Sequence, residues 1–352
     1  MAAVRLGFVG VGYITVNSHL PALQPLVESG EVVLQAFCDV DEEAVAQQAA
    51  AFKVGATYTD HRAMYEAEDL DAVYICLPPT AHTDQVPAAA ERGLHLFVEK
   101  PQTLDMAQAV EHAAAIEKAG IVSQIGFQSR YYPASEFVRQ RLAELTPRHA
   151  SVQLFYGGKP VRWWTSRYEE CGGSFVENTI HMVDLLRYFL GDIERVSAFY
   201  NWRRPGEGPE PMNMPHVYGV NYGFASGAVA NATTSRVLTN VSAGRREVLV
   251  VCDDALIEWS AQKVVENGET VWEAGEDNSA PGRQARAFVD AVKAADPSLP
   301  RSPYGASNNS LAAVLGANIS AESAGQMLEL ADVVGGKVRW KGDVVYAPEI
   351  QG

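Results

Sequence analysis

The first 126 residues alternate between two kinds of segment, and this alternation constrains the fold more than any other feature. Short apolar runs recur here, at Leu6–Val9, Val32–Cys38, Ala72–Leu77, Leu94–Val98 and Ile121–Gly126. Between them lie stretches with helical spacing that are rich in Ala, Glu and Gln, such as Asp41–Phe52 and Leu104–Ala119. Buried strands separated by helices of this length are typical of βαβ units. We therefore expect an α/β Rossmann domain, with a parallel sheet and helices on both faces.

The pattern changes after about Gly126. A helix is expected over Ser135–Leu145. Alternating polar and apolar segments then predict strands at His149–Tyr156, Val196–Trp202, His216–Phe224, Ala228–Thr234, Glu247–Val251, Leu256–Trp259 and Glu269–Trp272. Tight turn signals separate several of these segments, which favours a large, mostly antiparallel open sheet.

Further helices are expected at Asn178–Leu190, Gly282–Ala295 and Asn308–Leu330. The segment Arg203–Pro215 holds four prolines and is expected to be a loop. We therefore predict a dinucleotide-binding domain over residues 1–126 and an α+β domain over residues 127–352, which serves substrate binding and oligomerisation. A C-terminal segment that packs back on the first domain is an alternative.

Composition narrows the class of protein. The formal net charge is −15, which argues against nucleic acid or an anionic membrane surface as a partner. No run of 18 apolar residues occurs, and the N-terminus does not have the pattern of a signal peptide. The four cysteines are scattered, without the spacing of a zinc site. We therefore expect a cytoplasmic protein with reduced thiols and no metal.

The strongest local motif is the glycine-rich run from Gly7 to Thr15, which begins in the first strand and leads into a helix. Gly10 and Gly12 allow a sharp turn and a close approach to a pyrophosphate, and the following helix N-terminus favours its negative charge. The third position of the G-x-G-x-x-G pattern is Thr15 rather than Gly or Ala, a departure that bears on how closely the helix packs against the strand. Tyr13 and Ile14 complete the expected cofactor loop.

Asp39 follows the second predicted strand, where an acidic residue binds the adenosine ribose hydroxyls. No Arg or Lys follows it to hold a 2′-phosphate, so we expect NAD rather than NADP. The alternative for Asp39 is a helix-capping or loop carboxylate.

At this point the sequence resembles the Gfo/Idh/MocA family, the group of glucose–fructose oxidoreductase and inositol dehydrogenase. Five short segments carry the resemblance, in this order and spacing: the glycine-rich start, Cys76 to His82, Glu99-Lys100-Pro101, Gly126 to Pro133, and Gly172-Gly173 through His181 to Asp184. The resemblance extends over essentially the whole chain and implies a soluble dehydrogenase that forms dimers or tetramers through its second sheet.

The resemblance implies roles for three catalytic residues. Lys100, directly after a predicted strand, would bind the substrate hydroxyl and the cofactor ribose and stabilise an alkoxide-like transition state. His181 would act as general acid and base, a task suited to a side chain that titrates near neutrality. Glu177 stands where the family commonly has Asp, and it would orient His181 or bind a substrate hydroxyl. The resemblance also implies a cis peptide bond between Lys100 and Pro101.

Two departures leave the substrate open. Glu177 extends its carboxylate by one methylene relative to Asp, and Thr179 replaces a common Gly. Spacings of four and three place Glu177, His181 and Asp184 on one face of a helix. Asp184 either binds substrate or pairs with a base such as Arg187, and the sequence does not favour one over the other.

Weaker matches complete the expected site. Further cofactor contacts are implied for Leu77, Pro78, Thr80, His82, Glu99 and Gln128. Further substrate contacts are implied for Arg130, Trp163, Trp164 and Arg167, with Arg162 beside them. Structural alternatives exist for several of these residues: a helix cap for His82, an ion pair at the domain junction for Arg130, and a plain hydrophobic interface for the tryptophans.

The function that follows is NAD(H)-dependent oxidation or reduction at a secondary hydroxyl of a sugar, sugar derivative or cyclitol. One alternative is an NAD-dependent glycosidase that oxidises its substrate transiently and eliminates the aglycone. Another is a cofactor-binding regulator of the same fold without catalytic activity. The presence of both Lys100 and His181 disfavours the regulator.

Overall fold

The computed structural model describes residues 2–157, 163–207, 212–238, 241 and 244–347. Contacts divide the chain into two compact units. Unit 1 holds Met1–Thr103, Gln108–Tyr131 and Ser279–Ser307. Unit 2 holds Leu104–Ala107, Tyr132–Asn278 and Asn308–Gly352.

Unit 1 contains a six-stranded sheet, called sheet A, in the order β3-β2-β1-β4-β5-β6, and every pair of neighbours is parallel. Its strands are β1 (Val4–Val9), β2 (Val32–Cys38), β3 (Ala56–Tyr58), β4 (Ala72–Ile75), β5 (His95–Val98) and β6 (Ser123–Ile125). The expected parallel Rossmann sheet is confirmed. The sequence missed β3, because Ala56–Tyr58 and its neighbours do not form an apolar run.

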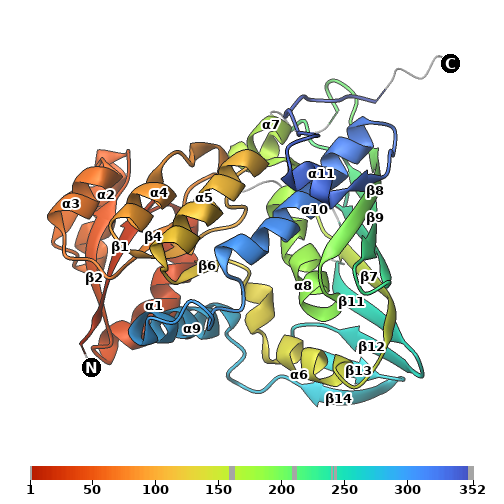
Figure 1. Ribbon diagram of the computed structural model, residues 1–352, viewed down its shortest axis with the longest axis horizontal. Helices are drawn as coiled ribbons and strands as arrows, with labels where there is room; N and C mark the ends of the chain where they lie inside the picture. The colour runs from red at the N-terminus through yellow and green to blue at the C-terminus, as the bar shows by residue number, and fades with distance from the viewer. Residues whose placement is uncertain (1, 158–162, 208–211, 239–240, 242–243, 348–352) are drawn as a thin grey trace. The chain divides into compact units, whose positions relative to one another are not determined.

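Helices cover both faces of sheet A (Figure 1). They are α1 (Leu20–Glu28), α2 (Glu42–Phe52), α3 (His61–Ala67), α4 (Gln85–Glu91), α5 (Met106–Ala119) and α9 (Ala280–Ala294), with short helices η1 (Thr15–His19), η2 (Pro79–Ala81) and η3 (Gln128–Tyr131). Asp41 and Asp60 cap α2 and α3, since each carboxylate accepts the N–H of the residue three positions later. The helices predicted near Asp41–Phe52 and Leu104–Ala119 are therefore confirmed with small shifts.

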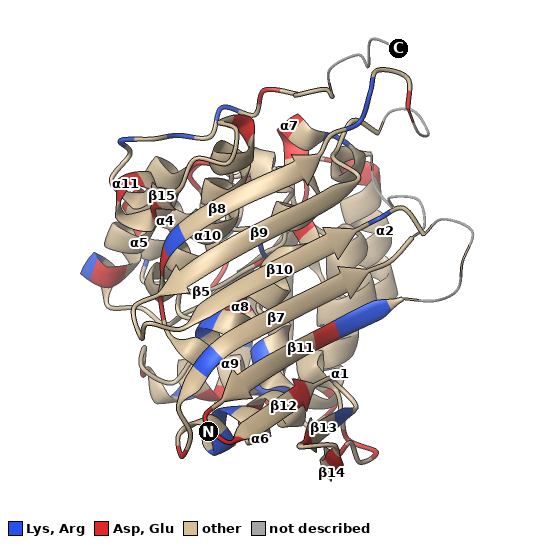
Figure 2. Cartoon of the chain, turned by 90° about the vertical axis from the view of Figure 1, so that its right-hand side faces the viewer, with Lys and Arg blue, Asp and Glu red and all other residues tan. Residues whose placement is uncertain are grey.

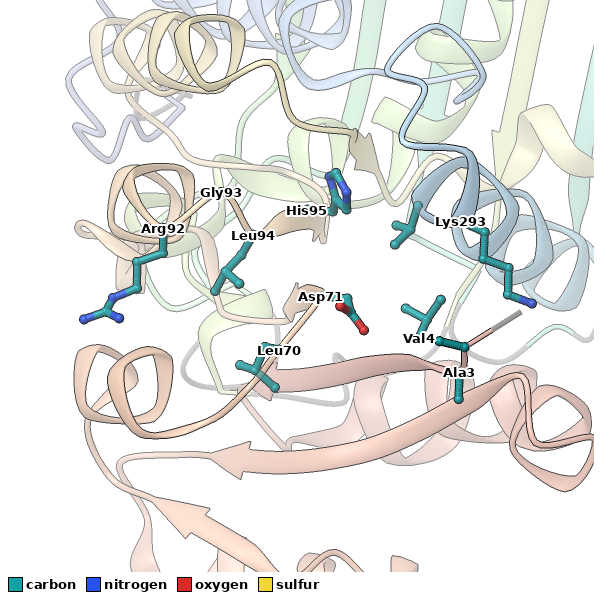
Figure 3. A pocket seen from close by; sticks show the side chains of 11 residues that line it. Ala3, Val4, Leu70, Asp71, Arg92, Gly93, Leu94, His95 and Lys293 are labelled. Carbon is teal, nitrogen blue, oxygen red and sulfur yellow. The ribbon is translucent and has the colours of Figure 1, made fainter.

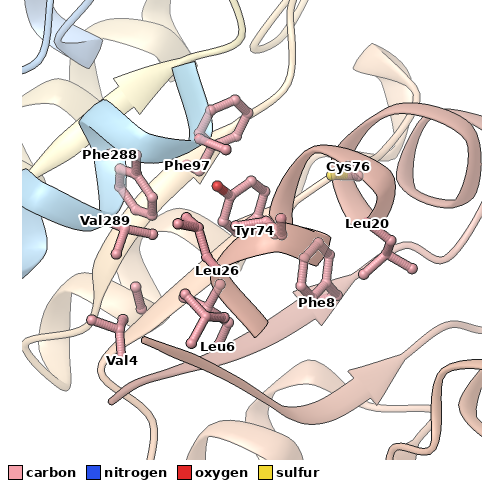
Figure 4. Packing of buried hydrophobic residues seen from close by; sticks show 14 of the residues in the cluster. Val4, Leu6, Phe8, Leu20, Leu26, Tyr74, Cys76, Phe97, Phe288 and Val289 are labelled. Carbon is pink, nitrogen blue, oxygen red and sulfur yellow. The ribbon is translucent and has the colours of Figure 1, made fainter. Parts of the chain in front are cut away.

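The core of unit 1 is an aromatic stack between sheet A and α9 (Figure 4). Tyr74 on β4 stacks on Phe97 of β5 with ring centroids 4.4 Å apart. Phe288 of α9 meets both rings edge-on, at 5.4 and 5.6 Å. A helix from late in the sequence thus completes the first core, and burial of such rings is a large share of the free energy of folding.

Unit 2 contains a nine-stranded sheet, called sheet B, in the order β14-β13-β12-β11-β7-β10-β9-β8-β15. Its strands are β7 (Pro147–Phe155), β8 (Ile193–Asn201), β9 (Val217–Phe224), β10 (Val229–Ser235), β11 (Arg245–Cys252), β12 (Ala255–Trp259), β13 (Lys263–Glu266), β14 (Glu269–Glu273) and β15 (Leu328–Glu329). Every pairing is antiparallel except that of β7 with β10. The predicted α+β unit with a mostly antiparallel sheet is confirmed, although β13 and β15 were not predicted.

The helices of unit 2 begin or end at different residues from those predicted. They are α6 (Pro133–Leu142), α7 (Tyr168–Cys171), α8 (Ile180–Leu190), α10 (Tyr304–Glu322) and α11 (Leu330–Val334), with η4 (Trp164–Ser166) and η5 (Phe175–Thr179). The prediction of one helix to Leu330 is wrong, because α10 ends at Glu322. The backbone of Ala324 and Gly325 is left-handed, with φ of 54° and 83°, and a helix does not continue through such residues.

One face of sheet B lacks helices over its central strands (Figure 2). Along β10 buried residues alternate with Val229, Asn231 and Thr233, which are at least partly exposed. On the other face Ser320 of α10 accepts the backbone N–H of Ala198 at 2.9 Å. Among the described residues no helix is both long and apolar enough to cross a membrane.

The glycines of unit 1 provide a graded test of backbone strain. Gly10 has φ of +89°, and a Cβ there would lie 2.4 Å from the carbonyl oxygen of Cys76. Gly30 has φ of +75° in open space, and Gly12 has neither constraint. In urea unfolding we expect Gly30→Ala to cost about 1–2 kcal/mol, Gly12→Ala under about 0.5, and Gly10→Ala clearly more than either. Equal losses for Gly10→Ala and Gly30→Ala would contradict a packing constraint at Gly10.

Candidate functional site

The cofactor residues expected in unit 1 gather at the carboxyl edge of sheet A. Gly10 follows β1, Asp39 follows β2, and Leu77 and Pro78 follow β4. Glu99 and Lys100 follow β5, and Gln128 begins η3 just after β6. In open parallel sheets, ligands bind at this edge.

The glycine-rich turn is held by hydrogen bonds on both sides of Gly10. The N–H of Gly10 donates to the carbonyl of Cys38 at 2.8 Å. The hydroxyl of Thr15 donates to the carbonyl of Gly10 at 2.7 Å. Thr15 is fully buried and lies in η1, a π-helical turn, so it fills the third motif position with a hydrogen bond rather than with a close glycine contact. Gly12 is exposed, and a Cβ there would have no atom within 4 Å, so a ligand can approach its backbone.

Asp39 closes this turn from the neighbouring strand. One carboxylate oxygen accepts the N–H of Val11 at 2.9 Å, and the other accepts the N–H of Asp41 at 3.1 Å. The helix cap of α2 is Asp41 rather than Asp39. Asp39 is thus anchored by loop contacts at the end of β2, the place where a ribose-binding acid is expected.

Glu99 is a buried carboxylate with two partners. Its Oε1 lies 2.8 Å from Nε2 of His19, and its Oε2 accepts the backbone N–H of Lys100 at 2.9 Å. Burial alone would raise the pKa of Glu99, but the hydrogen bond and charge of His19, with Lys100, hold it below its usual value. Burial likewise opposes the charged form of His19, yet Cys76 and Glu99 raise its pKa to about 10. The pair is therefore ionic at neutral pH and fixes the backbone at Lys100.

The half-buried Lys100 follows this pair directly. The peptide bond between Lys100 and Pro101 is cis, as the resemblance implies. Nothing in the motif pointed to His19, which lies 80 residues from Glu99 in sequence. Its place at the end of η1 was not predictable from spacing.

The loop after β4 holds Leu77, Pro78, Thr80 and His82, and it excludes the expected role of His82 as a helix cap. Leu77 and Pro78 are half-buried, and Thr80 is exposed. His82 is buried and does not cap α4, whose N-cap is Asp84, so the capping alternative is wrong. Burial, with a contribution from the charge of His112, lowers the pKa of His82 to about 4, so its ring is neutral at pH 7.

Arg130 forms hydrogen bonds with Arg301 within unit 1. Its guanidinium donates to the backbone carbonyl of Arg301, and Arg301 donates back to the carbonyl of Arg130 at 2.9 Å. Arg301 also lies over the ring of Tyr131, 5.1 Å from its centroid. These contacts favour a structural role over the expected substrate contact.

In unit 2 the predicted catalytic pair straddles a change of helix type. The helix predicted from Asn178 instead begins as the π-helix η5, and α8 starts at Ile180. Glu177 therefore lies in η5 and is buried, whereas His181 lies in the first turn of α8 and is half-buried. His181 and Asp184 keep the spacing of three within α8, as predicted. Glu177 lies outside α8, and a π turn spaces residues differently from an α turn, so the α-helical spacing of four does not apply to it.

Thr179 and the two glycines explain how η5 is held. The Thr179 hydroxyl bonds that of Thr234 on β10 at 2.7 Å and donates to the carbonyl of Ser174 at 3.3 Å. Gly172 and Gly173 have φ of 70° and 78°, and a Cβ on Gly173 would lie 2.7 Å from the hydroxyl of Tyr218. The departure from Gly at position 179 thus adds a tie between η5 and sheet B.

Asp184 has no exposed surface. It accepts the hydroxyl of Ser310 at 2.7 Å and lies 3.8 Å from Arg187. Of the two roles left open by the sequence, the structure supports the pairing with Arg187, because a fully buried carboxylate with these partners has no surface left for a substrate.

The residues of the aromatic segment before the Gly-Gly turn differ in their exposure to solvent. Trp163 is 64% exposed, Trp164 is half-buried, and Arg167 is exposed and precedes α7. Arg162 lies outside the described residues. The exposed ring of Trp163 is accessible for stacking on a ligand or for packing in an interface, so both alternatives remain for it.

A pocket of about 450 Å³ in unit 1 lies elsewhere (Figure 3). It opens at the amino ends of β1, β4 and β5, near Leu70, Asp71 and His95. Two of its charged groups are paired, Asp71 with Arg5 at 2.7 Å and Lys293 with Glu31 at 2.6 Å. It is on the edge opposite the cofactor residues. The described residues hold no cluster of three or more His, Cys, Asp or Glu fit for a metal ion.

Comparison with known proteins identifies the family of the chain. Residues 4–127 match a family described as "Oxidoreductase family, NAD-binding Rossmann fold", and residues 146–258 match the GFO/IDH/MocA C-terminal domain. A D-xylose 1-dehydrogenase (NADP(+)) of Haloferax volcanii is 33% identical over 55% of this chain and 60% of its own length. A myo-inositol 2-dehydrogenase of Thermotoga maritima is 26% identical over 55% of this chain and 58% of its own.

The matches therefore span a little under three-fifths of this chain and about three-fifths of these relatives. Among solved structures, an oxidoreductase domain protein from Kribbella flavida has a TM-score of 0.80 at 21% identity, covering 94% of this chain and all of that one. At that identity the likeness concerns the fold.

The raised pKa of His19, which lies beside Cys76 and Glu99, predicts a pH dependence of stability. His19 has an ordinary pKa of 6.5 when unfolded and about 10 when folded, so between these values the folded state holds the extra proton. Stability from this group is complete below pH 6.5 and is lost as pH rises toward 10. Urea unfolding should show a steeper fall from pH 6.5 to 9.5 in the parent than in His19→Gln.

His216→Gln is the matched control, because His216 is a partly exposed histidine beside Glu207. The control should keep the parent's slope. An unchanged slope in His19→Gln would rule out a raised pKa of His19 in the folded state.

Proposed function

Because the chain belongs to the GFO/IDH/MocA family of oxidoreductases, we propose that it is an NAD(H)-dependent dehydrogenase that acts on a secondary hydroxyl of a sugar, sugar derivative or cyclitol. The observation that carries the proposal is Lys100, held at the carboxyl end of β5 by the buried Glu99 carboxylate. An ammonium group on a residue whose backbone is held at this edge of a Rossmann sheet is suited to a reacting oxygen.

The residues of unit 1 fit a dinucleotide. The open backbone at Gly12 accommodates a pyrophosphate, and the N-terminus of the following helix favours its charge. The anchored carboxylate of Asp39 suits ribose hydroxyls and opposes a 2′-phosphate. Val40 and Asp41, which follow it, bring no positive charge. These features support NAD over NADP, although the Haloferax relative is named for NADP(+).

In the forward direction the chain's own residues move the proton and stabilise the charge. His181 takes the proton of the substrate hydroxyl, Lys100 stabilises the oxyanion that forms, and Glu177 orients His181 or the substrate. Bound NAD⁺ supplies the hydride acceptor. The protein thus contributes proton transfer, position and electrostatic field.

The catalytic assignment predicts a separation of turnover from cofactor binding. Lys100→Ala and His181→Ala should each lower kcat by at least about 100-fold, because each removes a group that acts in proton transfer or on the oxyanion. NAD⁺ affinity by calorimetry should stay within about threefold in His181→Ala, and in Lys100→Ala, which also loses the ribose contact, it should fall far less than kcat. The readout is formation of NADH with a panel of sugars and inositols.

Lys118→Ala, at an exposed position of α5, is the matched control and should behave as the parent. Unchanged turnover in both Lys100→Ala and His181→Ala would refute the assignment. Failure to bind NAD⁺, with no turnover across the panel, would refute the proposed function itself.

We also propose that a second copy of the chain covers the open face of sheet B. This face is broad and poor in charge at its centre (Figure 2). It exposes Phe199 by 66% and Val229 by 53%. A two-fold pairing buries the same surface on both copies, as closed oligomers require.

Light scattering should therefore give a mass of two or four chains. Asn221→Arg puts a charge on an exposed position of central β9 and should lower that mass to one or two chains. Glu66→Arg, on the surface of α3 in unit 1, is the control and should not change the mass. A monomeric parent at micromolar concentration would contradict the pairing.

We propose the cytoplasm as the place of action. The four cysteines are unpaired and buried. Free thiols are usual in reducing compartments, so this state supports the proposal.

A further inference from the structure

Two guanidinium groups lie at one end of sheet B, within unit 2. Arg236 follows β10, and Arg203 lies two residues after β8. β10 runs parallel to β7, and the N–H of Tyr156, just after β7, donates to the carbonyl of Ser235 at 3.0 Å. Tyr156 and Arg236 therefore leave the sheet side by side.

Short contacts link the two guanidinium groups. Arg236 donates from Nη1 to the hydroxyl of Ser174 at 3.3 Å, and its guanidinium lies 4.8 Å from the ring centroid of Tyr156. Arg203 donates from Nε to the carbonyl of Met214 at 2.8 Å. The hydroxyl of Ser174 in turn lies 3.4 Å from the sulfur of Met214. The cluster of Arg203, Arg236, Tyr156 and Ser174 is called the arginine cluster below.

The arginine cluster carries two positive charges that no carboxylate of the described residues pairs directly, although Glu207 and Glu177 act on it by their charge. Arg203 is 6% exposed, and the structure shows no carboxylate within 4 Å of either guanidinium among the described residues. Nε of Arg236 is buried without a hydrogen-bond partner in that same part of the chain, and the hydroxyl of Tyr156 is buried beside that of Ser174. Buried donors and charges of this kind are costly unless a partner satisfies them.

The pKa shifts of Arg203 and Tyr156 reflect the burial and the charges of the cluster. Burial lowers the pKa of Arg203, and the charge of Arg236 lowers it further, against the opposing effects of Tyr218 and Glu207. Burial also raises the pKa of Tyr156 to about 12, so its hydroxyl remains protonated at neutral pH and can donate a hydrogen bond. An anion placed here would relieve the repulsion between the two arginines.

The arginine cluster adjoins the helix that bears the proposed catalytic carboxylate. Ser174 is the N-cap residue of η5, which holds Glu177 three positions later. The bond between Thr179 and Thr234 ties η5 to β10 two residues before Arg236. A substrate that contacts Glu177 therefore lies near η5 and the end of β10, the elements that also hold Ser174 and Arg236.

We propose that Arg203 and Arg236 bind an oxyanion on the substrate, a carboxylate or a phosphate, so that the substrate is an acidic sugar or polyol. The proposal rests on the proposed function and narrows its substrate class. Guanidinium groups match the planar, paired oxygens of such anions, and the hydroxyls of Ser174 and Tyr156 supply further donors. The alternative is that the arginines only brace the segments around Met214 and Ser174.

The test compares matched sugars that differ in charge. The full-length protein with NAD⁺ is assayed with D-glucose, D-glucuronate and D-glucose 6-phosphate, and with the corresponding galactose set. We expect one acidic member to exceed its neutral partner in kcat/KM by about tenfold to a hundredfold. This is the factor that corresponds to the free energy of a hydrogen bond to a charged group. Which acidic member prevails separates a carboxylate site from a phosphate site.

Variants at Arg236 separate binding from bracing. Arg236→Met should abolish the acidic preference through KM, with kcat within about threefold, and Arg236→Lys should restore part of it. Arg148→Met removes an exposed arginine of sheet B that pairs with Asp253, and it should keep the preference. Equal kcat/KM for acidic and neutral members in the parent would overturn the proposal.

The same proposal is overturned if Arg236→Met lowers the unfolding temperature but leaves the preference unchanged. Where no sugar is turned over, the shift of the unfolding temperature by each acidic and neutral sugar decides the question. A rise with acidic sugars alone, absent in Arg236→Met, supports the cluster, and no such difference refutes it. Turnover of neutral sugars alone would leave the proposed function intact, and loss of NAD⁺ binding would remove that function separately.

Discussion

The carboxylate of Glu99 is the interaction on which the first unit's edge depends. It joins the end of η1 through His19 and the end of β5 through the N–H of Lys100. The end of β6 must accommodate it as well, since a Cβ on Gly126 would lie 2.7 Å from its Oε1. A buried carboxylate is tolerable only with such partners. Three segments that are distant in sequence therefore contact the same carboxylate. The backbone position of Lys100 depends on all three contacts.

A second theme is the use of π-helical turns after glycine. η1 follows Gly10 and Gly12, and η5 follows Gly172 and Gly173. In each turn a threonine hydroxyl, that of Thr15 or Thr179, bonds the carbonyl five residues earlier. The threonines that depart from the expected glycines thus stabilise wider turns, and each turn carries a residue of the candidate site, His19 or Glu177. Such turns are frequent at functional sites because they redirect one side chain without breaking the helix.

Periodic patterns predicted the larger elements of the fold, and the failures have physical causes. The parallel and antiparallel sheets followed from apolar runs and alternation. However, β3 lacks an apolar run, and α10 ends before Ala324 and Gly325, whose backbone is left-handed. Motifs found the residues that follow strands of sheet A, because strand ends are local features. They did not find His19 or Arg236, whose partners are brought by topology. Asp184 shows the same limit, since its partner Ser310 lies 126 residues away.

The distribution of charge gives the arginine cluster its significance. The chain has a net charge of −15, so its long-range field repels an acidic substrate, and salt screens that field beyond about 8 Å. Arg203 and Arg236 act inside that range, where partial burial weakens screening and strengthens each contact. Recognition of an anion by this protein therefore depends on a few donors held by β8, β10 and η5, rather than on its overall charge. The ties that hold those donors, such as Thr179 to Thr234, are as necessary to that recognition as the guanidinium groups themselves.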